Sequence, residues 1–328
     1  MSTNHDIAVY AGYVKEKESL LKSASGGIAT AISEEIINRG GYVAGVSYTE
    51  DFHGAEYTIT NNLSDLDRLR GSKYIEVNKG TVYKDVRNLL DKGKTVLFFG
   101  LPCTVAAMYS FLGKEYDNLI TCELICHAPI STKVHEQYVA YLEEKYNSTL
   151  CSFSVRYKKK GWTPPYLRAE FKNGQIFEDE FYSTEYGIAF RNLMKPSCFK
   201  CQFKGDNRTG DLMIGDFWGA SKTDPFWNDN GISVMFVHTQ KADELLRSIK
   251  DIELFESTFD RAVEHNSNVL THRKINESRI KFSKLFEKKG LFYAAKHYVP
   301  VKKKIKSFIA HLIPKQSKSF LKKIIGKK

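Results

Sequence analysis

The sequence predicts an α/β protein with a mixed α+β second half. An alternating strand–helix core is followed by an antiparallel part, a cysteine-rich loop region and a helical C-terminus. Up to about residue 150, short apolar runs alternate with helical patterns, which is typical of a parallel sheet covered by helices. After that point, three strand patterns follow one another without an intervening helix, which favours antiparallel pairing. The hydrophobic content of 42% and the aromatic content of 13% are sufficient for a packed core.

The first half contains four apolar runs and three helical patterns. The runs predict strands at residues 7–11, 42–46, 95–99 and 119–125. The helical patterns cover residues 26–39, 81–92 and 131–145. In the first of them Ile28, Ile32 and Ile36 share one face, and the glycines at 40 and 41 predict its C-terminal end. Ser131 is a suitable N-cap for the last.

The second half changes in character. It contains three strand patterns, at residues 151–157, 166–171 and 175–181. Residues 172–174 supply a hairpin turn between the last two. A loop-rich region is expected over 185–220, a buried strand over 232–237 and mostly helix over 241–298. We therefore expect three segments: 1–150 as the α/β part, 151–290 as a second part with the Cys-x-x-Cys pair, and 291–328 as a basic amphipathic tail.

Cys198 and Cys201 form a Cys-x-x-Cys pair, which in a reducing compartment is usually a metal-ligand pair or a redox motif. Two further ligands are needed to complete a zinc site or an iron–sulfur cluster. Cys103 and Cys126 each end a predicted strand, where open α/β sheets place their ligands. We predict a metal site formed by Cys103, Cys126, Cys198 and Cys201.

An alternative interpretation treats the other four cysteines as ordinary buried small residues. Cys122 lies in the middle of a predicted strand and Cys151 begins another. Neither position is expected to reach the metal site.

The positive charge is concentrated in the tail. The net charge is +11, but residues 301–328 contain ten lysines and no acidic residue, which leaves 11 − 10 = +1 for the rest. Apolar residues in this tail recur at helical spacing, which is typical of a helix that lies on an anionic membrane surface. The alternatives are a helix packed on the body and a solvated tail. Nucleic acid is not an expected partner, because the body shows no basic face.

The start of the chain indicates a cytoplasmic location. Residues 1–6 lack the positive and apolar regions of a secretory signal. No apolar stretch approaches the roughly 20 residues that cross a bilayer. We expect a cytoplasmic protein, with the tail as its contact to the inner membrane face.

Six motifs in order resemble a known family. They are Ser23-Ala24-Ser25-Gly26-Gly27, Arg70-Gly71-Ser72-Lys73-Tyr74, Gly100-Leu101-Pro102-Cys103, Leu124-Ile125-Cys126-His127, Arg156-Tyr157-Lys158 with Gly161-Trp162, and Pro196-Ser197-Cys198 through Gly215-Asp216-Phe217-Trp218-Gly219. Over residues 7–240 the series resembles the beta subunits of coenzyme F420-reducing hydrogenases and related dehydrogenases. It is most similar to the bacterial branch found with polysaccharide-synthesis genes.

The resemblance implies a flavoprotein with FAD and a 4Fe–4S cluster, which passes electrons between an iron–sulfur donor and an organic hydride carrier or substrate. Two motifs beside proposed ligands depart from the family pattern: Leu101 and Thr104 replace a usual Thr and Gln around Cys103, and Ala128 replaces a usual Gly after Cys126. The chain also has no cysteine before Cys103, whereas many relatives begin with a ferredoxin-like segment. A separate ferredoxin-like partner is therefore expected to supply the electrons.

Further residues are predicted to hold the cofactors. We expect the flavin or its phosphates to contact Ser25, Gly26, Gly27, Ser72, Lys73, Tyr74, Arg156 and Asp216. The Gly-Gly helix start exposes main-chain N–H groups to a phosphate, although by itself it is equally typical of a tight turn. Lys73 is expected at a phosphate or at the flavin N1–C2 edge, and otherwise on the surface.

Three of the predicted sites have open alternatives. His127 is predicted to donate a proton near the flavin, or else to be a hydrogen-bonded structural residue. Asp216 is expected to organise the site, paired with Arg191, Lys195 or main-chain N–H groups. Arg156 is predicted to clamp an acidic group, or else to lie on a solvated strand face.

The leading hypothesis is a cytoplasmic iron–sulfur flavoprotein oxidoreductase, with a role in polysaccharide biosynthesis. The alternative is a zinc- or cluster-stabilised interaction subunit without catalysis. The substrate, the direction of electron flow and the use of the deazaflavin coenzyme are left open.

Overall fold

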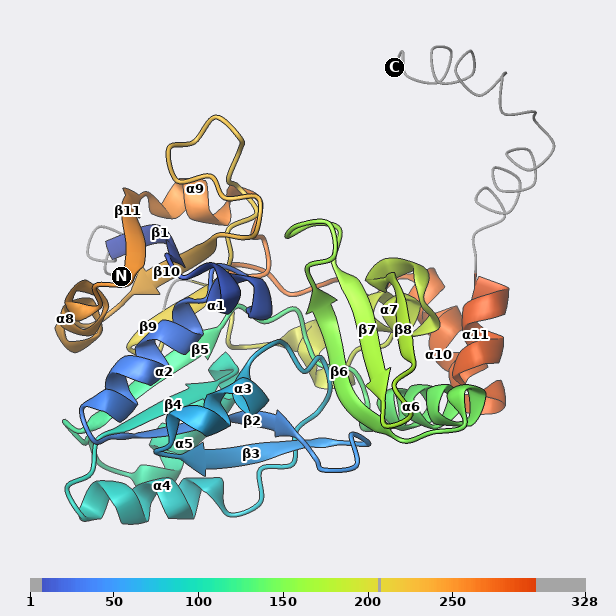
Figure 1. Cartoon of the computed structure of the whole chain (residues 1–328), viewed down its shortest axis with the longest axis horizontal. Helices are drawn as coiled ribbons and strands as arrows, with labels where there is room; N and C mark the ends of the chain where they lie inside the picture. The colour runs from blue at the N-terminus through green and yellow to red at the C-terminus, as the bar shows by residue number, and fades with distance from the viewer. Residues whose placement is uncertain (1–7, 206–207, 299–328) are drawn as a thin grey trace. The chain divides into compact units, whose positions relative to one another are not determined.

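The structure is a computed structural model, and it describes residues 8–205 and 208–298 (Figure 1). The chain divides into a first unit up to Ile275 and a second unit from Asn276 onward. Of the tail predicted at 291–328, residues 291–298 lie within the described part of the chain, whereas residues 299–328, with the basic stretch 301–328, lie outside it. Within the described residues, no helix is long and apolar enough to span a bilayer.

The first unit is built on an eight-stranded sheet with the strand order β11-β1-β10-β9-β5-β4-β2-β3. Its strands are β1 (Ala8–Val14), β2 (Tyr42–Tyr48), β3 (Ala55–Thr60), β4 (Val96–Gly100), β5 (Leu119–Leu124), β9 (Leu212–Asp216), β10 (Ser233–Val237) and β11 (Ile252–Ser257). Strands β2, β4, β5 and β9 pair in parallel, whereas β3, β10, β1 and β11 are added by antiparallel pairing. Strand β1 therefore runs in the same direction as β9.

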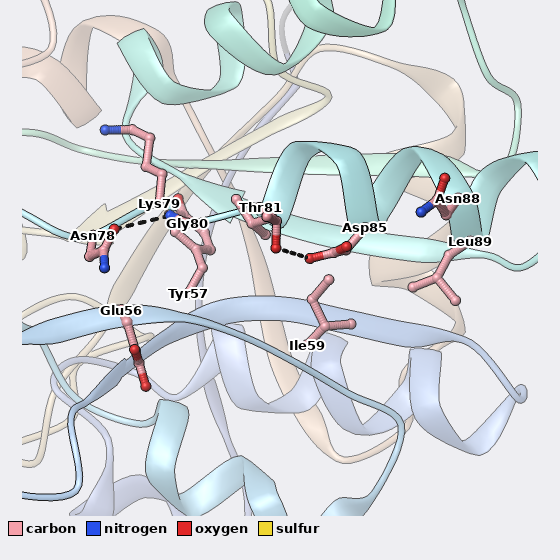
Figure 2. Close-up of a pocket in the computed structure, with 11 residues that line it drawn as sticks. Glu56, Tyr57, Ile59, Asn78, Lys79, Gly80, Thr81, Asp85, Asn88 and Leu89 are labelled. Atoms are coloured by element: carbon pink, nitrogen blue, oxygen red, sulfur yellow. Dashed lines mark hydrogen bonds between the residues drawn. The ribbon is translucent and has the colours of Figure 1, made fainter.

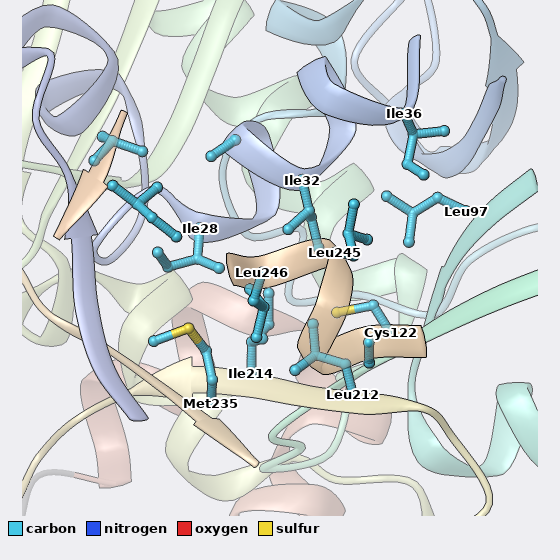
Figure 3. Close-up of a cluster of buried hydrophobic side chains, with 14 of the residues drawn as sticks. Ile28, Ile32, Ile36, Leu97, Cys122, Leu212, Ile214, Met235, Leu245 and Leu246 are labelled. Atoms are coloured by element: carbon cyan, nitrogen blue, oxygen red, sulfur yellow. The ribbon is translucent and has the colours of Figure 1, made fainter. Parts of the chain in front are cut away.

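Helices cover both faces of this sheet, and the strand alternation shows which helix covers which face. Leu97, Leu212 and Ile214 share one buried cluster with Ile28, Ile32 and Ile36 of α2 (Ile28–Asn38) and with Leu245 and Leu246 of α8 (Gln240–Ser248) (Figure 3). Phe98, the neighbour of Leu97, instead joins a cluster with Val86 of α4 (Val82–Asp91) and Val105 of α5 (Pro102–Leu112). Successive strand residues point to opposite faces, so a continuous apolar run buries itself on both.

In the described part of the chain, five further α-helices and a second sheet belong to the first unit. The remaining helices are α1 (Lys17–Lys22), α3 (Leu66–Leu69), α6 (Thr132–Tyr146), α7 (Glu185–Asn192) and α9 (Phe259–Glu264). Ser131 caps α6 by accepting a hydrogen bond from the Lys133 main chain, as predicted. The second sheet is antiparallel with the order β6-β7-β8, formed by β6 (Leu150–Tyr157), β7 (Tyr166–Phe171) and β8 (Ile176–Glu180).

The predicted fold class is confirmed, and each strand and helix expected in the first half is present. The region 185–220 was predicted as loop-rich, but it contains α7 and β9, which lies in the middle of the large sheet. Strand β9 is only five residues long, and both of its faces are buried at Leu212, Met213 and Ile214, so it lacks an alternating pattern. The region 241–298 was predicted to be mostly helical, but it also contains the edge strand β11.

The described part of the second unit is a pair of helices, α10 (Glu277–Lys289) and α11 (Leu291–Tyr298). Gly290 ends α10 with a positive φ of 79°, and its N–H bonds to the Phe286 carbonyl. The rings of Phe282 and Tyr298 meet edge to face at 5.2 Å. The two helices therefore form a compact hairpin.

Candidate redox site at the carboxyl edge of the sheet

The carboxyl ends of β1, β2, β4, β5 and β9 meet at one edge of the large sheet, since these five strands run in the same direction. Open α/β sheets bind their ligands at this edge. Most of the predicted site residues follow these strand ends: Ser25, Gly26 and Gly27 after β1, Cys103 after β4, Cys126 and His127 after β5, and Asp216 at the end of β9.

The predicted phosphate-binding turn is held tightly by its neighbours. The Ser25 hydroxyl donates to the Ile232 carbonyl at 2.9 Å, and the Gly26 N–H donates to the Ser233 hydroxyl at 3.0 Å. A Cβ on Gly26 would lie 2.4 Å from the Gly12 carbonyl oxygen, so close backbone packing explains this glycine. Gly27 has φ +85° and precedes α2 without a side-chain cap. Of the three residues, Gly27 therefore leaves the helix start free for an anion.

Arg156 and Asp216 form a buried ion pair at this edge. An Arg156 amino group lies 2.7 Å from Asp216 Oδ1, and the two side chains are 3% and 18% exposed. The same carboxylate oxygen accepts the indole N–H of Trp162 at 2.9 Å, while Arg156 also donates to the Ala24 carbonyl at 2.9 Å. Arg156 is thus not on a solvated strand face, and it joins the end of β6 to the loop between α1 and α2 and to the end of β9.

The two basic side chains expected beside Asp216 have other partners. Arg191 lies instead over the Tyr182 ring at 4.0 Å, and Lys195 pairs with Glu76 at 3.1 Å. Asp216 faces Arg156 because the small sheet packs its first strand against the end of β9, a tertiary contact between segments 60 residues apart.

Two lysines at this edge are desolvated. Burial lowers the pKa of Lys73 to about 7, and its ammonium donates to the carbonyls of Arg68 and Arg70. Burial, followed by repulsion from Arg156, lowers the pKa of Lys158 to about 7 as well. Lys158 donates to the carbonyls of Leu20 and Ser25, so it fixes the loop before α2.

Aromatic rings connect this ion pair to the cysteines. Tyr74 stacks on Phe190 of α7 with ring centroids 4.5 Å apart, and His127 stacks on Phe190 at 4.6 Å. Burial raises the pKa of Tyr74, and the nearby Arg156 opposes that rise. A continuous series of contacts therefore runs from His127, next to Cys126, through two rings to Arg156. Ser72, the neighbour of Lys73, adjoins Tyr74 in the same partly buried segment.

The main chain next to His127 is strained. Ala128 is buried and has φ +117°, a region that favours glycine. The family pattern has glycine at this position, so the departure noted in the sequence carries a conformational cost. Strained residues of this kind cluster at functional sites.

The structure brings the four predicted metal ligands into one neighbourhood. Burial is the main cause that raises the pKa of Cys126 to about 11; Lys204 opposes the rise, and Cys103 and Cys198 contribute to it. Burial also raises the pKa of Cys198, and the neighbouring Cys201 and Cys103 add to that rise. Four sulfur donors fit an iron–sulfur cluster or zinc, although no three candidate ligands in the described parts of the chain already converge on one metal position.

The alternative interpretation of the other cysteines holds only for Cys122. Cys122 is fully buried in the core, whereas Cys103 and Cys151 are exposed and Cys126 is partly buried. Cys151 lies on β6, and it is not among the groups that shift the pKa of Cys126 or Cys198.

Two basic residues tie the cysteine loop to the sheet, and sequence reasoning missed both. Lys204 donates to the Cys126 carbonyl at 2.6 Å and to the Asn268 carbonyl. Arg208 donates to the Phe203 carbonyl at 2.8 Å and lies 3.9 Å from the buried Glu123 carboxylate. Both residues follow the Cys-x-x-Cys pair closely in the sequence, and this position could have predicted them, because cations beside a set of thiolates offset its negative charge.

The structure also contains a pocket between β3 and α4 (Figure 2). It has a volume of about 560 Å³ and is lined among others by Glu56, Tyr57, Asn78 and Asp85. None of the predicted site residues lines it. The candidate site is therefore defined by the strand ends rather than by this pocket.

Comparisons with known proteins identify the family of the chain. A family model described as the C terminus of the coenzyme F420 hydrogenase/dehydrogenase beta subunit matches residues 93–259, just over half of the chain. The chain therefore belongs to this family, which is a family of redox-enzyme subunits.

Among solved structures, the fold is similar to a chain of the F420-reducing NiFe hydrogenase complex from Methanosarcina barkeri, studied as a xenon derivative. The TM-score is 0.53 at 18% identity, and the match covers 80% of this chain and 89% of that chain. No curated protein matches the sequence significantly.

Proposed function

We propose that the protein is an iron–sulfur flavoprotein oxidoreductase that passes electrons between a separate donor protein and an organic substrate or hydride carrier. The observation that supports it is the arrangement at the carboxyl edge of the sheet. Four cysteines lie at one end, the Arg156–Asp216 pair lies at the other, and the rings of His127, Phe190 and Tyr74 connect them. Family membership supports the same interpretation.

The cysteines in this proposal are the ligands of the iron–sulfur group. Cys103, Cys126, Cys198 and Cys201 supply four sulfurs, and Lys204 lies beside three of them. Its positive charge offsets the charge that the thiolates acquire on coordination. The backbone of Cys126 is held by Lys204, so the ligand after β5 is fixed in direction.

The flavin-binding residues lie on the other side of the ring stack. Gly27 offers the uncapped start of α2 to a phosphate, with Ser25 and Gly26 shaping the turn. Lys73 lies beside Ser72 and Tyr74. Burial lowers its pKa to about 7, so the side chain loses its charge readily near that pH. A bound 4Fe–4S cluster would supply single-electron transfer, and FAD would supply the conversion between single electrons and hydride.

His127 is the candidate proton donor in this arrangement. Its ring stacks on Phe190 next to Cys126, so it lies between the cysteines and the flavin residues. Arg156 and Asp216 position the flavin rather than transfer protons, because they hold each other in a buried ion pair.

The partner and the setting follow from the same proposal. A ferredoxin-like protein is the donor, and the organic substrate belongs to polysaccharide synthesis in the cytoplasm. The basic tail at 301–328 would bring the enzyme to the inner membrane face.

The test is the composition of the protein after anaerobic purification. We expect about four irons, matching acid-labile sulfide and one FAD per chain, with absorbance near 400 nm. Cys198→Ser should lose iron, whereas Cys151→Ser should keep it, because Cys151 is an exposed cysteine outside the set. Iron retained in Cys198→Ser would contradict the ligand assignment.

A second function is favoured by one observation. Four sulfurs fit zinc as well as iron, and Gly26 is explained by backbone packing without a phosphate. In that case the protein is a zinc-stabilised interaction subunit without catalysis. Colourless protein with stoichiometric zinc and no flavin would support this function and exclude the first.

A further inference from the structure

Helix α10 presents two different faces. Phe282 and Phe286 are buried on one of them. The opposite side carries two apolar and three basic residues, namely Ile280, Lys281, Lys284, Leu285 and Lys288. Intervals of three and four residues place these five side chains on one side of a helix, and together with Glu277 they line one surface groove of about 390 Å³. We call these five residues the basic face of α10.

The charge of this face is not balanced within the two helices. Over residues 277–298 the sequence contains six lysines and arginines but two glutamates. Glu277 lies in the first turn of α10, and Glu287 lies outside the basic face, where the Ser283 hydroxyl donates to it at 3.3 Å. Lys284 and Lys288 are one turn apart, so their charges repel each other and weaken the helix. An anionic partner outside the two helices would remove this repulsion.

Apolar side chains accompany the lysines. Ile280 is 46% exposed next to Lys281, and Tyr293 of α11 is 41% exposed. The chain then continues into residues 301–328, which contain ten lysines, no acidic residue and apolar residues at helical spacing. Nucleic acid is bound mainly through charge, whereas the boundary of an anionic bilayer takes up both ammonium groups and apolar side chains. The composition of the face therefore matches a bilayer surface better than a nucleic acid.

We propose that the basic face of α10 binds the anionic headgroups of a lipid bilayer. The three lysines contact the headgroups, and Ile280 enters the boundary between headgroups and acyl chains. This inference extends the membrane contact proposed for the tail to a folded element, and it requires neither the cluster nor the flavin. Two contacts joined in one chain bind a surface more tightly than either contact alone.

The experiment measures binding of the full-length protein to vesicles by flotation. One set of vesicles contains phosphatidylglycerol and phosphatidylcholine in equal amounts, and the other contains phosphatidylcholine alone. A gel shift with a DNA duplex measures nucleic-acid binding by the same proteins. The test variant combines Lys281→Gln, Lys284→Gln and Lys288→Gln, and it keeps the tail unchanged.

The matched control changes three exposed lysines of the first unit, Lys79, Lys92 and Lys94, to glutamine, so both triple variants lose the same charge. We expect the wild type to bind the anionic vesicles more tightly than phosphatidylcholine alone. The test variant should lose about 100-fold in affinity, because each lysine near an anionic bilayer contributes about 1 kcal/mol, or about fivefold at 1.4 kcal/mol per tenfold. The control should bind as the wild type does.

Two further measurements separate the basic face from the tail. Ile280→Ser should weaken vesicle binding by about 5- to 10-fold, since about half of this side chain is still exposed and becomes buried in the bilayer. Bound vesicles should protect Lys281, Lys284 and Lys288 against acylation in peptide mass mapping, whereas Lys92 should stay reactive. Neither measurement alters the tail.

Three results would overturn the proposal. They are equal binding of the wild type to both kinds of vesicle, equal affinity of the wild type and the test variant for anionic vesicles, and tighter binding of the DNA duplex through the same lysines. The second result would assign the membrane contact to the tail alone, and the third would make the face a nucleic-acid surface. Iron and flavin contents of the same sample test the redox function separately, because vesicle binding requires neither cofactor.

Discussion

Removing the charge of Asp216 is expected to destabilise the first unit strongly, because it leaves Arg156 as an unpaired buried cation. The charged atoms are 2.7 Å apart, and the Arg156 side chain is 3% exposed. At an effective dielectric constant of about 20, two unit charges at this distance attract by about 6 kcal/mol before desolvation is subtracted. Breaking such a pair from one side typically costs about 3–5 kcal/mol. We expect Asp216→Asn to lower the free energy of unfolding by that amount.

Removing the charge of Arg156 instead should lower the free energy of unfolding by a smaller amount. Arg156→Met removes the buried cation and leaves Asp216, which is 18% exposed and still accepts the indole N–H of Trp162. We expect a loss of about 2–3 kcal/mol, mainly from the carbonyl of Ala24 that loses its donor. The double variant should resemble Arg156→Met alone, so the coupling energy between the two sites should equal the cost of Asp216→Asn, about 3–5 kcal/mol.

Urea unfolding followed by tryptophan emission measures all four proteins. The matched control is the exposed pair Lys22–Glu18, which is 2.8 Å apart with side chains 48% and 73% exposed. Glu18→Gln should change the free energy of unfolding by less than about 0.5 kcal/mol. Additive effects in the double variant, or a cost below about 1 kcal/mol for Asp216→Asn, would refute the buried ion pair.

Three other predictions concern the backbone and the two desolvated lysines. Ala128→Gly should raise the free energy of unfolding by about 0.5–1 kcal/mol, since relief of strain at φ +117° exceeds the entropy cost of glycine. A lower Tm for the variant in thermal unfolding would contradict this prediction. Because burial lowers the pKa of Lys158 to about 7 from 10.5, the unfolded chain binds the extra proton between these values, so stability from this group rises by about 2 kcal/mol from pH 7 to 9. Urea titrations at both pH values should show that rise reduced in Lys158→Met. Lys73 has a pKa of about 7 and a partly accessible side chain, so it should be acylated at pH 7 faster than the buried Lys158. Peptide mass mapping measures the two rates, and equal labelling of the two lysines would contradict the prediction.

Local patterns in the sequence predicted most of the fold correctly. Continuous apolar runs such as 95–99 are long enough to show both buried faces, and the spacing of Ile28, Ile32 and Ile36 identifies the covered side of α2. Strand β9 was not predicted, because it has only five residues and its last two, glycine and aspartate, are typical of a turn. Its place in the sheet depends on partners at β5 and β10, which are distant in sequence.

The sequence predicted part of the candidate site. Cys103 and Cys126 are predicted as ligands because each ends a predicted strand, and the structure places both at one edge of the sheet with the Cys-x-x-Cys pair. The contacts that shape the site could not be predicted from the sequence: Lys204 donates to the Cys126 carbonyl, Phe190 stacks on Tyr74, and Trp162 donates to Asp216 only in the folded chain.

The sequence by itself determined the α/β class, the order of the motifs and the residue types that a redox centre needs. These properties are local, because each depends on the spacing of residues within one helix, strand or turn. Only the tertiary structure decided that Asp216 pairs with Arg156, that Lys158 and Lys73 lose solvent, and that Trp218 stays exposed. Those properties depend on which side chains surround a group in space, and burial and charge act through space rather than along the chain.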